Sequence, residues 1–146
     1  MKTLIIMQGA PGSGKSTVAQ SLIEPYLRTG NYAEICSADN YFLKLDENGN
    51  LFYKFDAARL PLAHDWCRRK AEGAAYADSQ LIVIDNTNIR IEHARPYAQI
   101  AQHFSYQLQI VRCYGTFQNI HGVPDAVVER MRGSMEDLST LLNTVF

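Results

Sequence analysis

The chain has few cysteines and little net charge. Its 146 residues include three cysteines, Cys36, Cys67 and Cys113, with no pair at C-x-x-C spacing. This pattern argues against a disulfide framework or a zinc site, so we expect buried free thiols. Lys and Arg number 14 against 15 Asp and Glu, a formal net charge of −1. The chain therefore lacks the overall excess of basic residues found in proteins that bind a long nucleic-acid backbone. Only a local basic patch could serve for such binding.

Long hydrophobic runs are also missing. No apolar stretch approaches the roughly 20 residues of a membrane span, and the N-terminus has no signal-peptide pattern. We therefore expect a cytoplasmic protein without a membrane partner. With 47% hydrophobic and 20% charged residues the composition is typical of a globular protein, and 146 residues suffice for a proper core. A single domain over residues 1–146 is the expectation.

The most informative segment is rich in glycine and follows a short apolar run. It reads "GAPGSGKST" from Gly9 to Thr17, and its spacing Gly9-x-x-x-x-Gly14-Lys15-Ser16 fits the P-loop, or Walker A, pattern. Glycines let backbone N–H groups converge on an anion, and the helix that follows adds the positive end of its dipole. The motif predicts a site for ATP and Mg²⁺, in which Lys15 reaches the outer phosphates and Ser16 binds the metal. The residues expected to bind the nucleotide are Gly9, Ala10, Pro11, Gly12, Ser13, Gly14, Lys15, Ser16 and Thr17.

Apolar runs alternate with amphipathic stretches along the whole chain. Strands are expected over 4–8, 33–37, 81–85 and 106–112, and helices over 16–28, 56–77, 92–104 and 125–135. This alternation predicts an α/β protein with the three-layer αβα fold, a short, mainly parallel sheet, and ligands at the carboxyl ends of the strands. Asn48-Gly49, between two apolar segments, predicts a small hairpin.

An acidic residue follows the third apolar run. Asp85 comes directly after Leu81–Ile84, and in a P-loop protein a carboxylate at this place holds Mg²⁺ opposite the loop hydroxyl. We therefore expect Ser16 and Asp85 as the metal site, with a turn-forming role as the alternative for Asp85. Thr87 and Asn88, just beyond, either orient the substrate or cap the next helix.

A second acidic residue, Asp39, follows the second apolar run. This strand would end on the same rim of the sheet as the phosphate loop, where a carboxylate can accept the proton of an attacking hydroxyl. The alternative is that Asp39 caps a local turn together with Asn40. Nearby aromatic residues either pack in the core or wall an acceptor pocket that stacks a base. They are Tyr41, Phe42, Tyr53, Phe55 and Trp66.

Five segments in a fixed order carry a resemblance to a known family. They read "GAPGSGKST", "SADNYF", "YKFDAARLPLAHDWC", "VIDNTNI" and "NIHGVPDAVVERM". With them the chain resembles the polynucleotide-kinase-like branch of P-loop kinases. The resemblance implies that Asp39 is the general base, that Lys15 and Ser16 contact phosphate and Mg²⁺, and that a small helical lid over 114–135 brings an arginine to the donor phosphates. We expect Arg130 in that role, with Arg132, about 200° away on the same helix, as the alternative; both are otherwise ordinary surface charges.

The sequence also departs from this family. Phage-type relatives carry arginines on either side of the acidic pair, to hold the phosphate beside the acceptor hydroxyl, where this chain has Ala38 and Phe42. They also carry an acid where this chain has Asn86, one residue after Asp85. The absent arginines weaken the case for a nucleic-acid acceptor, and the position of Asn86 weakens that of Asp85 as metal ligand.

Taken together, these features predict an ATP- and Mg²⁺-dependent phosphotransferase with Lys15, Asp39 and Arg130 as catalytic residues. The resemblance favours the 5′-hydroxyl of a single-stranded nucleic acid as acceptor. A kinase of a small hydroxyl compound or nucleoside is the first alternative, and a nucleotide-binding switch or partner module with slow hydrolysis is the second. The sequence gives no indication of the oligomeric state.

Overall fold

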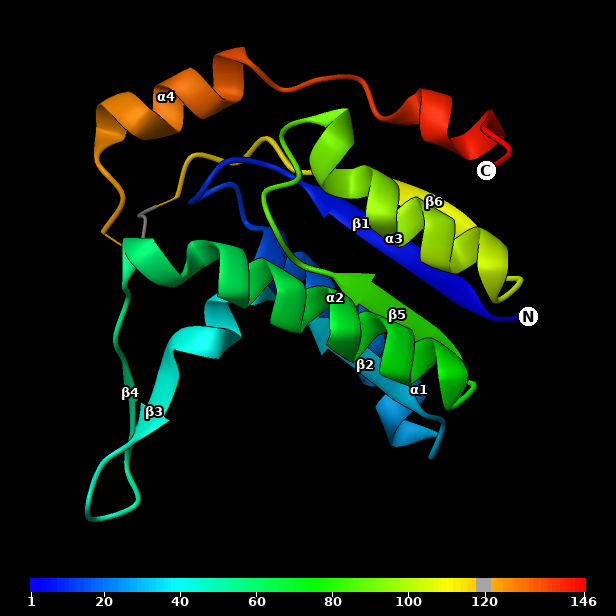
Figure 1. The fold of residues 1–146 in the computed structure, drawn as a ribbon, viewed down its shortest axis with the longest axis horizontal. Coiled ribbons are helices and arrows are strands. Elements are labelled where there is room, and N and C mark those ends of the chain that lie inside the picture. Colours follow the sequence, from blue (N-terminus) through cyan, green and yellow to red (C-terminus); the bar gives the residue numbers. More distant parts are fainter. Residues whose placement is uncertain (118–121) are drawn as a thin grey trace.

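The computed structural model describes residues 1–117 and 122–146, in which helices and strands alternate (Figure 1). The strands are β1 (Thr3–Gln8), β2 (Ala33–Cys36), β3 (Leu43–Leu45), β4 (Leu51–Tyr53), β5 (Leu81–Ile84) and β6 (Gln107–Arg112). The α-helices are α1 (Lys15–Arg28), α2 (Leu60–Tyr76), α3 (Ile91–His103) and α4 (Asp125–Gly133). Short 3-10 helices are η1 (Ala38–Phe42), η2 (Ala57–Arg59) and η3 (Ser139–Asn143). Among these described residues no helix is long and apolar enough to cross a membrane.

A parallel sheet in the order β2-β5-β1-β6 forms the middle layer. Its strands are short and rich in Ile, Leu and Val, as in sheets covered on both faces. Leu4 and Ile6 face α2 and α3, whereas Ile5 and Met7 face α1, because successive strand residues point to opposite sides. Figure 1 shows α2 and α3 on one face and α1 on the other. The predicted three-layer αβα fold is confirmed.

The boundaries of several elements differ from the expected ones. Ser37, Asp85 and Tyr106 lie just outside the strands that were expected to contain them. The helix expected over 56–77 is in two pieces: the Asp56 carboxylate accepts from the Ala58 N–H (3.0 Å) and caps η2, and α2 starts only at Leu60. The Asp56 side chain thus satisfies a backbone N–H at the break between the two pieces.

The predicted hairpin is present and projects from the body of the molecule (Figure 1). β3 and β4 pair antiparallel, and the Asp46 carboxylate accepts from the N–H groups of Asn48 (2.9 Å) and Asn50 (2.8 Å) to close the turn. Gly49 supplies the positive φ of +81° that the turn requires. All residues of both strands are exposed, so the hairpin is held to the body chiefly through its base.

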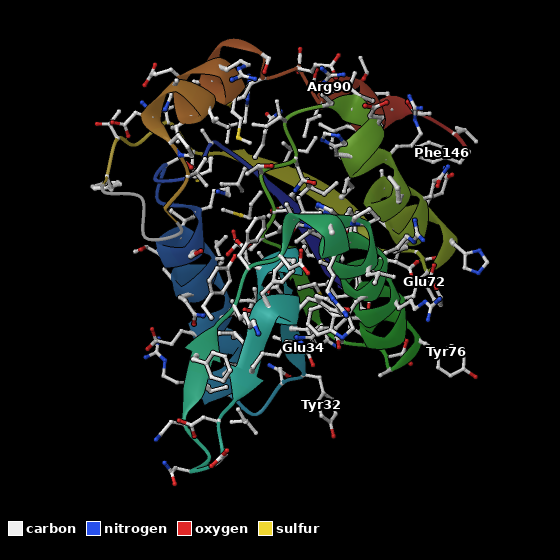
Figure 2. The ribbon with its side chains drawn as sticks, turned by 60° about the vertical axis from the view of Figure 1, so that its left-hand side comes forward. Tyr32, Glu34, Glu72, Tyr76, Arg90 and Phe146 are labelled. Carbon is white, nitrogen blue, oxygen red and sulfur yellow. The ribbon has the colours of Figure 1, made fainter. Side chains whose placement is uncertain are left out.

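The two ends of the sheet differ in character. Tyr32, directly before β2, and Tyr76, at the end of α2, are 78% and 83% exposed, and Figure 2 shows their side chains pointing outward. They mark the amino ends of the strands. The polar residues predicted to act in catalysis lie at the opposite, carboxyl end, which is where ligands bind in open parallel sheets.

Candidate active site

The loop between β1 and α1 is shaped to receive an anion. Gly12 and Gly14 adopt positive φ values of +82° and +90°. No side chain caps α1, and no acidic residue lies in its first turn, so the N–H groups at the helix start and its dipole are available to a ligand. A Cβ on Gly9 would collide with the Ser13 side chain and lie 2.8 Å from the Cys113 carbonyl oxygen. The loop thus needs glycine at this position, and its concave backbone fits a phosphate chain.

Lys15 lies largely buried beside this loop. Its Nζ donates to the Ala10 carbonyl oxygen at 3.4 Å. Burial lowers the pKa of Lys15, and the carboxylates of Asp85 and Asp39 oppose that shift. The ammonium group therefore stands in the electric field of both acids that the sequence singled out. A bound phosphate would stabilise its charge further.

Ser16 and Asp85 meet across the carboxyl end of the sheet. The Ser16 hydroxyl donates to Asp85 Oδ2 at 2.8 Å, and Asp85 is only 8% exposed. The Asp85 N–H donates to the Cys36 carbonyl oxygen (2.9 Å), which continues the β2-β5 pairing and fixes the acid. Mg²⁺ takes oxygen ligands and is bound in nucleotide sites by one or two carboxylates together with phosphates. The two residues expected to bind the metal are thus neighbours and form a suitable donor pair.

Asp39 lies in η1, and Asn86 fixes the start of this short helix. Asn86 Oδ1 accepts from the buried Ala38 N–H at 2.8 Å, while its Nδ2 lies 3.4 Å from the Tyr97 hydroxyl and 3.5 Å from Cys67 Sγ. The amide thus joins β5 to the turn that carries Asp39. In the sequence Asn86 stands out only as a departure from the family that the chain resembles, because nothing in the sequence shows that it faces Ala38.

Replacing Asn86 by Ala should therefore weaken both the fold and the placement of Asp39. The Ala38 N–H would lose its acceptor, and a buried donor left unpaired costs about 1–3 kcal/mol. We expect the free energy of unfolding, measured by urea denaturation, to fall by about that amount. Asn40→Ala is the control, since Asn40 is an exposed residue of the same turn and its loss should cost less than about 0.5 kcal/mol. Equal stabilities of the two variants would contradict this role.

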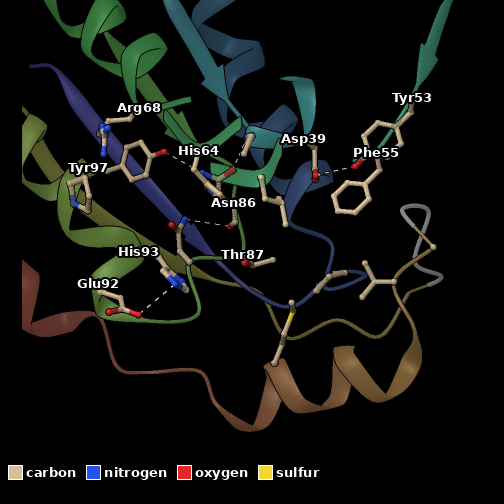
Figure 3. A pocket seen from close by; sticks show the side chains of 18 of the residues that line it. Asp39, Tyr53, Phe55, His64, Arg68, Asn86, Thr87, Glu92, His93 and Tyr97 are labelled. Carbon is tan, nitrogen blue, oxygen red and sulfur yellow. Dashed lines mark hydrogen bonds and ion pairs between the residues drawn. The ribbon is translucent and has the colours of Figure 1, made fainter. Parts of the chain in front are cut away.

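A cavity of about 720 Å³ opens beside Asp39 (Figure 3). Tyr53 and Phe55 line it, and the Tyr53 hydroxyl donates to Asp39 Oδ1 at 3.3 Å. Burial, with the Asp39 carboxylate as a second cause, raises the pKa of Tyr53 to about 12, so this hydroxyl stays protonated at neutral pH. The cavity therefore places a carboxylate at the edge of an aromatic wall.

Only part of the expected aromatic wall belongs to this cavity. Tyr53 and Phe55 line it, whereas Phe42 is 1% exposed and lies in the core. Tyr41 and Trp66 pack against that core, with ring centroids 6.1 Å apart. The packing interpretation is therefore correct for these three residues.

The loop between β5 and α3 is bonded firmly to β1. Asn88, with a positive φ of +46°, donates from Nδ2 to the Met7 carbonyl oxygen at 2.7 Å, and Gly9 N–H donates to the Thr87 carbonyl oxygen at 3.1 Å. The fully buried Gln8 donates to the Glu136 carbonyl oxygen at 2.7 Å. Asn88 is thus a structural residue, although it also borders the cavity with Thr87. Gln8 is the last residue of β1, and its side-chain amide also donates to the Asn88 carbonyl oxygen of this loop at 3.0 Å.

The segment after β6 reaches back to the phosphate loop. Gly115 N–H donates to the Ser13 carbonyl oxygen (3.1 Å) and Phe117 N–H to that of Gly12 (2.7 Å). Arg132 Nη2 donates to the Gly115 carbonyl oxygen at 3.0 Å. Of the lid expected over 114–135, residues 118–121 lie outside the described part of the chain.

The two arginines of α4 differ in their surroundings. Arg132 is half-buried and connects α4 to the segment that contacts the phosphate loop, whereas Arg130 is exposed. Met131, between them, lines the cavity beside Asp39. The helix therefore borders the cavity and is connected to the phosphate loop through Gly115, and the assignment of Arg130 as lid arginine stays a prediction.

Comparison with known proteins gives a family match. Residues 4–115 match a family model described as "AAA domain". Human NEDD4-binding protein 2 is 33% identical over 138 residues, and 2′,3′-cyclic-nucleotide 3′-phosphodiesterase of Pongo abelii is 33% identical over 110 residues. These matches cover 88% and 75% of this chain but only 7% and 24% of the two relatives. The chain thus corresponds to a small part of each relative's length.

Solved structures share the fold at low sequence identity. Chaetomium thermophilum Kti12 in complex with ADP-AlF3 aligns over 92% of this chain and 80% of its own, with a TM-score of 0.60 and 14% identity. The Pnkp1/Rnl/Hen1 complex contains a chain that aligns over 88% of this chain and 38% of its own, with a TM-score of 0.54 and 18% identity. At these identities the likeness supports the fold alone.

Proposed function

The chain belongs to the AAA domain family, as a P-loop kinase-like member, and we propose that it is an ATP- and Mg²⁺-dependent phosphotransferase acting on a hydroxyl group. One observation carries the proposal: the phosphate loop, the Ser16–Asp85 pair and the Asp39 carboxylate all lie at the carboxyl end of one sheet, with a cavity beside Asp39. A protein that only binds nucleotide has no need of a carboxylate facing a cavity beside the phosphate loop.

Each residue then has a distinct task. The loop amides and Lys15 would bind the phosphate chain of ATP, and Ser16 and Asp85 would hold Mg²⁺, which offsets phosphate charge when bound. Asp39 accepts the proton of the acceptor hydroxyl while its oxygen forms a bond to the γ-phosphorus and the bond to ADP breaks. Arg130 would stabilise the charge on the transferring group.

The acceptor we propose is the 5′-hydroxyl of a nucleic acid. The Tyr53 and Phe55 rings line the cavity next to Asp39, and aromatic rings of this kind stack bases without strict sequence preference. One similar protein, the 2′,3′-cyclic-nucleotide 3′-phosphodiesterase of Pongo abelii, is named for a nucleotide substrate, which supports a nucleotide-like acceptor. A small hydroxyl compound is the second candidate, favoured because Ala38 and Phe42 are buried and offer the acceptor no charge.

ADP release in the presence of a single-stranded oligonucleotide tests this proposal. A 5′-hydroxyl oligonucleotide should stimulate ADP formation, whereas the same sequence carrying a 5′-phosphate should not, because its 5′ position is already phosphorylated. The stimulation should weaken as salt rises if the acceptor is a nucleic acid. Stimulation by a nucleoside alone would support the small-molecule candidate, and equal rates with both oligonucleotides would contradict the 5′-hydroxyl of a nucleic acid as the acceptor.

The lid helix allows a matched comparison of two arginines. If Arg130 contacts the transferring phosphoryl group, Arg130→Gln should lower turnover about 10- to 100-fold, the value of a charge-assisted hydrogen bond. Arg132→Gln removes the bond to Gly115 and should act mainly on stability. Turnover and melting temperature are measured for both variants, and the reverse pattern would assign the catalytic role to Arg132.

A further inference from the structure

We propose that Arg68 forms an anion subsite in the acceptor cavity and binds a phosphate group of the acceptor away from the hydroxyl that reacts. The proposal rests on the proposed function for its orientation, since the reacting hydroxyl is assigned to Asp39. The chemical class is a nucleoside that already carries a phosphate, as a 3′-nucleotide or the first unit of a nucleic acid does.

Arg68 lines the same cavity as Asp39. Among the described residues that line the cavity, Arg68 is the one Lys or Arg side chain. In Figure 3 it lies on one side of His64, while Asp39 with Tyr53 and Phe55 lies on the other. An acceptor with its hydroxyl at Asp39 would therefore extend its other end toward Arg68.

Arg68 is held in place by an ion pair but is not neutralised by it. Arg68 Nη2 lies 2.6 Å from Asp65 Oδ1, and Arg69 Nη2 lies 3.1 Å from Asp65 Oδ2. Two guanidinium groups thus share one carboxylate, which leaves a net positive charge. Asp65 and Arg69 do not border the cavity, whereas Arg68 does. A guanidinium has five N–H donors in a planar fork that matches phosphate oxygens, so Arg68 can bind an anion while paired with Asp65.

The other ionisable groups in the cavity leave Arg68 as the permanent cation. Burial lowers the pKa of His64, His93 lowers it further, and Asp39 opposes the shift, so His64 is neutral at neutral pH. Glu92 lies 3.8 Å from both Arg90 Nη1 and His93 Nε2, and Arg90 lies outside the cavity lining. The Glu92 carboxylate therefore has a cation of its own and does not cancel the charge of Arg68.

Arg68 lies on α2, one helical turn after His64, so its charge enters the cavity from another element than η1, which carries Asp39.

Equilibrium binding of two probes tests the subsite. Adenosine 3′-monophosphate and adenosine are titrated calorimetrically into the protein in the presence of Mg²⁺ and a saturating non-hydrolysable ATP analogue, so that the phosphate loop is filled. The wild type should bind the phosphate-bearing probe about 10- to 100-fold more tightly, the value of a charge-assisted hydrogen bond. Arg68→Gln should abolish this preference and leave adenosine binding unchanged, and Arg68→Lys should restore part of it.

Arg69→Gln is the matched control, because Arg69 is the next residue of the same helix and pairs with the same Asp65. It should keep the wild-type preference. Equal binding of both probes by the wild type, binding of neither, equal weakening of both in Arg68→Gln, or a like effect of Arg69→Gln would overturn the proposal. Because the assay needs no turnover, it separates the two claims: preferential binding without phosphoryl transfer would refute the kinase, and transfer without the preference would refute the subsite.

Discussion

Asp39→Asn is expected to lower phosphoryl transfer about 10²- to 10⁴-fold, the contribution typical of a positioned general base. The substitution keeps the shape of the side chain and removes its ability to accept the proton. Asp39 lies in η1, outside the phosphate loop. The affinity for ATP should therefore change little, and the two quantities together distinguish a kinase from a module that only binds nucleotide.

The measurement is a steady-state transfer assay combined with calorimetric titration of an ATP analogue. Glu47→Gln is the control, because Glu47 is an exposed acid at the tip of the hairpin and its loss changes the net charge equally. Its activity should match that of the wild type. Asp39→Asn with wild-type transfer, or with ATP binding lost in parallel, would refute the role of Asp39 as base.

Lys15→Met is expected to remove most nucleotide binding and to lower transfer about 10²- to 10³-fold, the cost of losing one preorganised charge donor. Methionine has a similar length and no charge. The wild type at a hundredfold excess of nucleotide over its dissociation constant gains about 2.7 kcal/mol, a rise of roughly 5–10 °C in melting temperature for a domain of this size. Lys15→Met should lose this rise.

The control for this prediction is Lys54→Met, which removes an exposed lysine beyond the hairpin. It should retain the full nucleotide-dependent rise. Melting curves with and without ATP analogue and Mg²⁺ provide the comparison. A Lys15→Met protein that is stabilised by nucleotide as strongly as the wild type would show that the loop binds phosphate without this lysine.

Much of the fold is encoded in short, local signals. The apolar runs at Leu4–Met7 and Leu81–Ile84 became buried strands, and the glycine spacing produced the positive φ values at Gly12 and Gly14. The Asn48-Gly49 turn likewise followed from two residues whose backbone preferences are strong. Such features depend on neighbours in sequence, which is why they can be predicted without knowing the tertiary structure.

The composition of the cavity could not be predicted in this way. Arg68 on α2 is 29 positions from Asp39 in the sequence, and the two line one cavity only because α2 packs beside η1. In the sequence, Asn86 is only a departure from an acidic motif. The structure shows that its side chain accepts a hydrogen bond from the Ala38 N–H. Contacts of this kind depend on how elements pack, which one sequence does not reveal.

We propose that this chain transfers a phosphoryl group from ATP to a hydroxyl acceptor. Transfer of a radiolabel from ATP tests this reaction most directly. Wild-type protein is incubated with γ-labelled ATP, Mg²⁺ and, separately, 5′-hydroxyl DNA, 5′-hydroxyl RNA, a nucleoside or no acceptor. We expect label on the 5′-hydroxyl oligonucleotide. Label on the nucleoside alone would move the acceptor to a small molecule, and label released only as free phosphate, or not at all, would contradict the account.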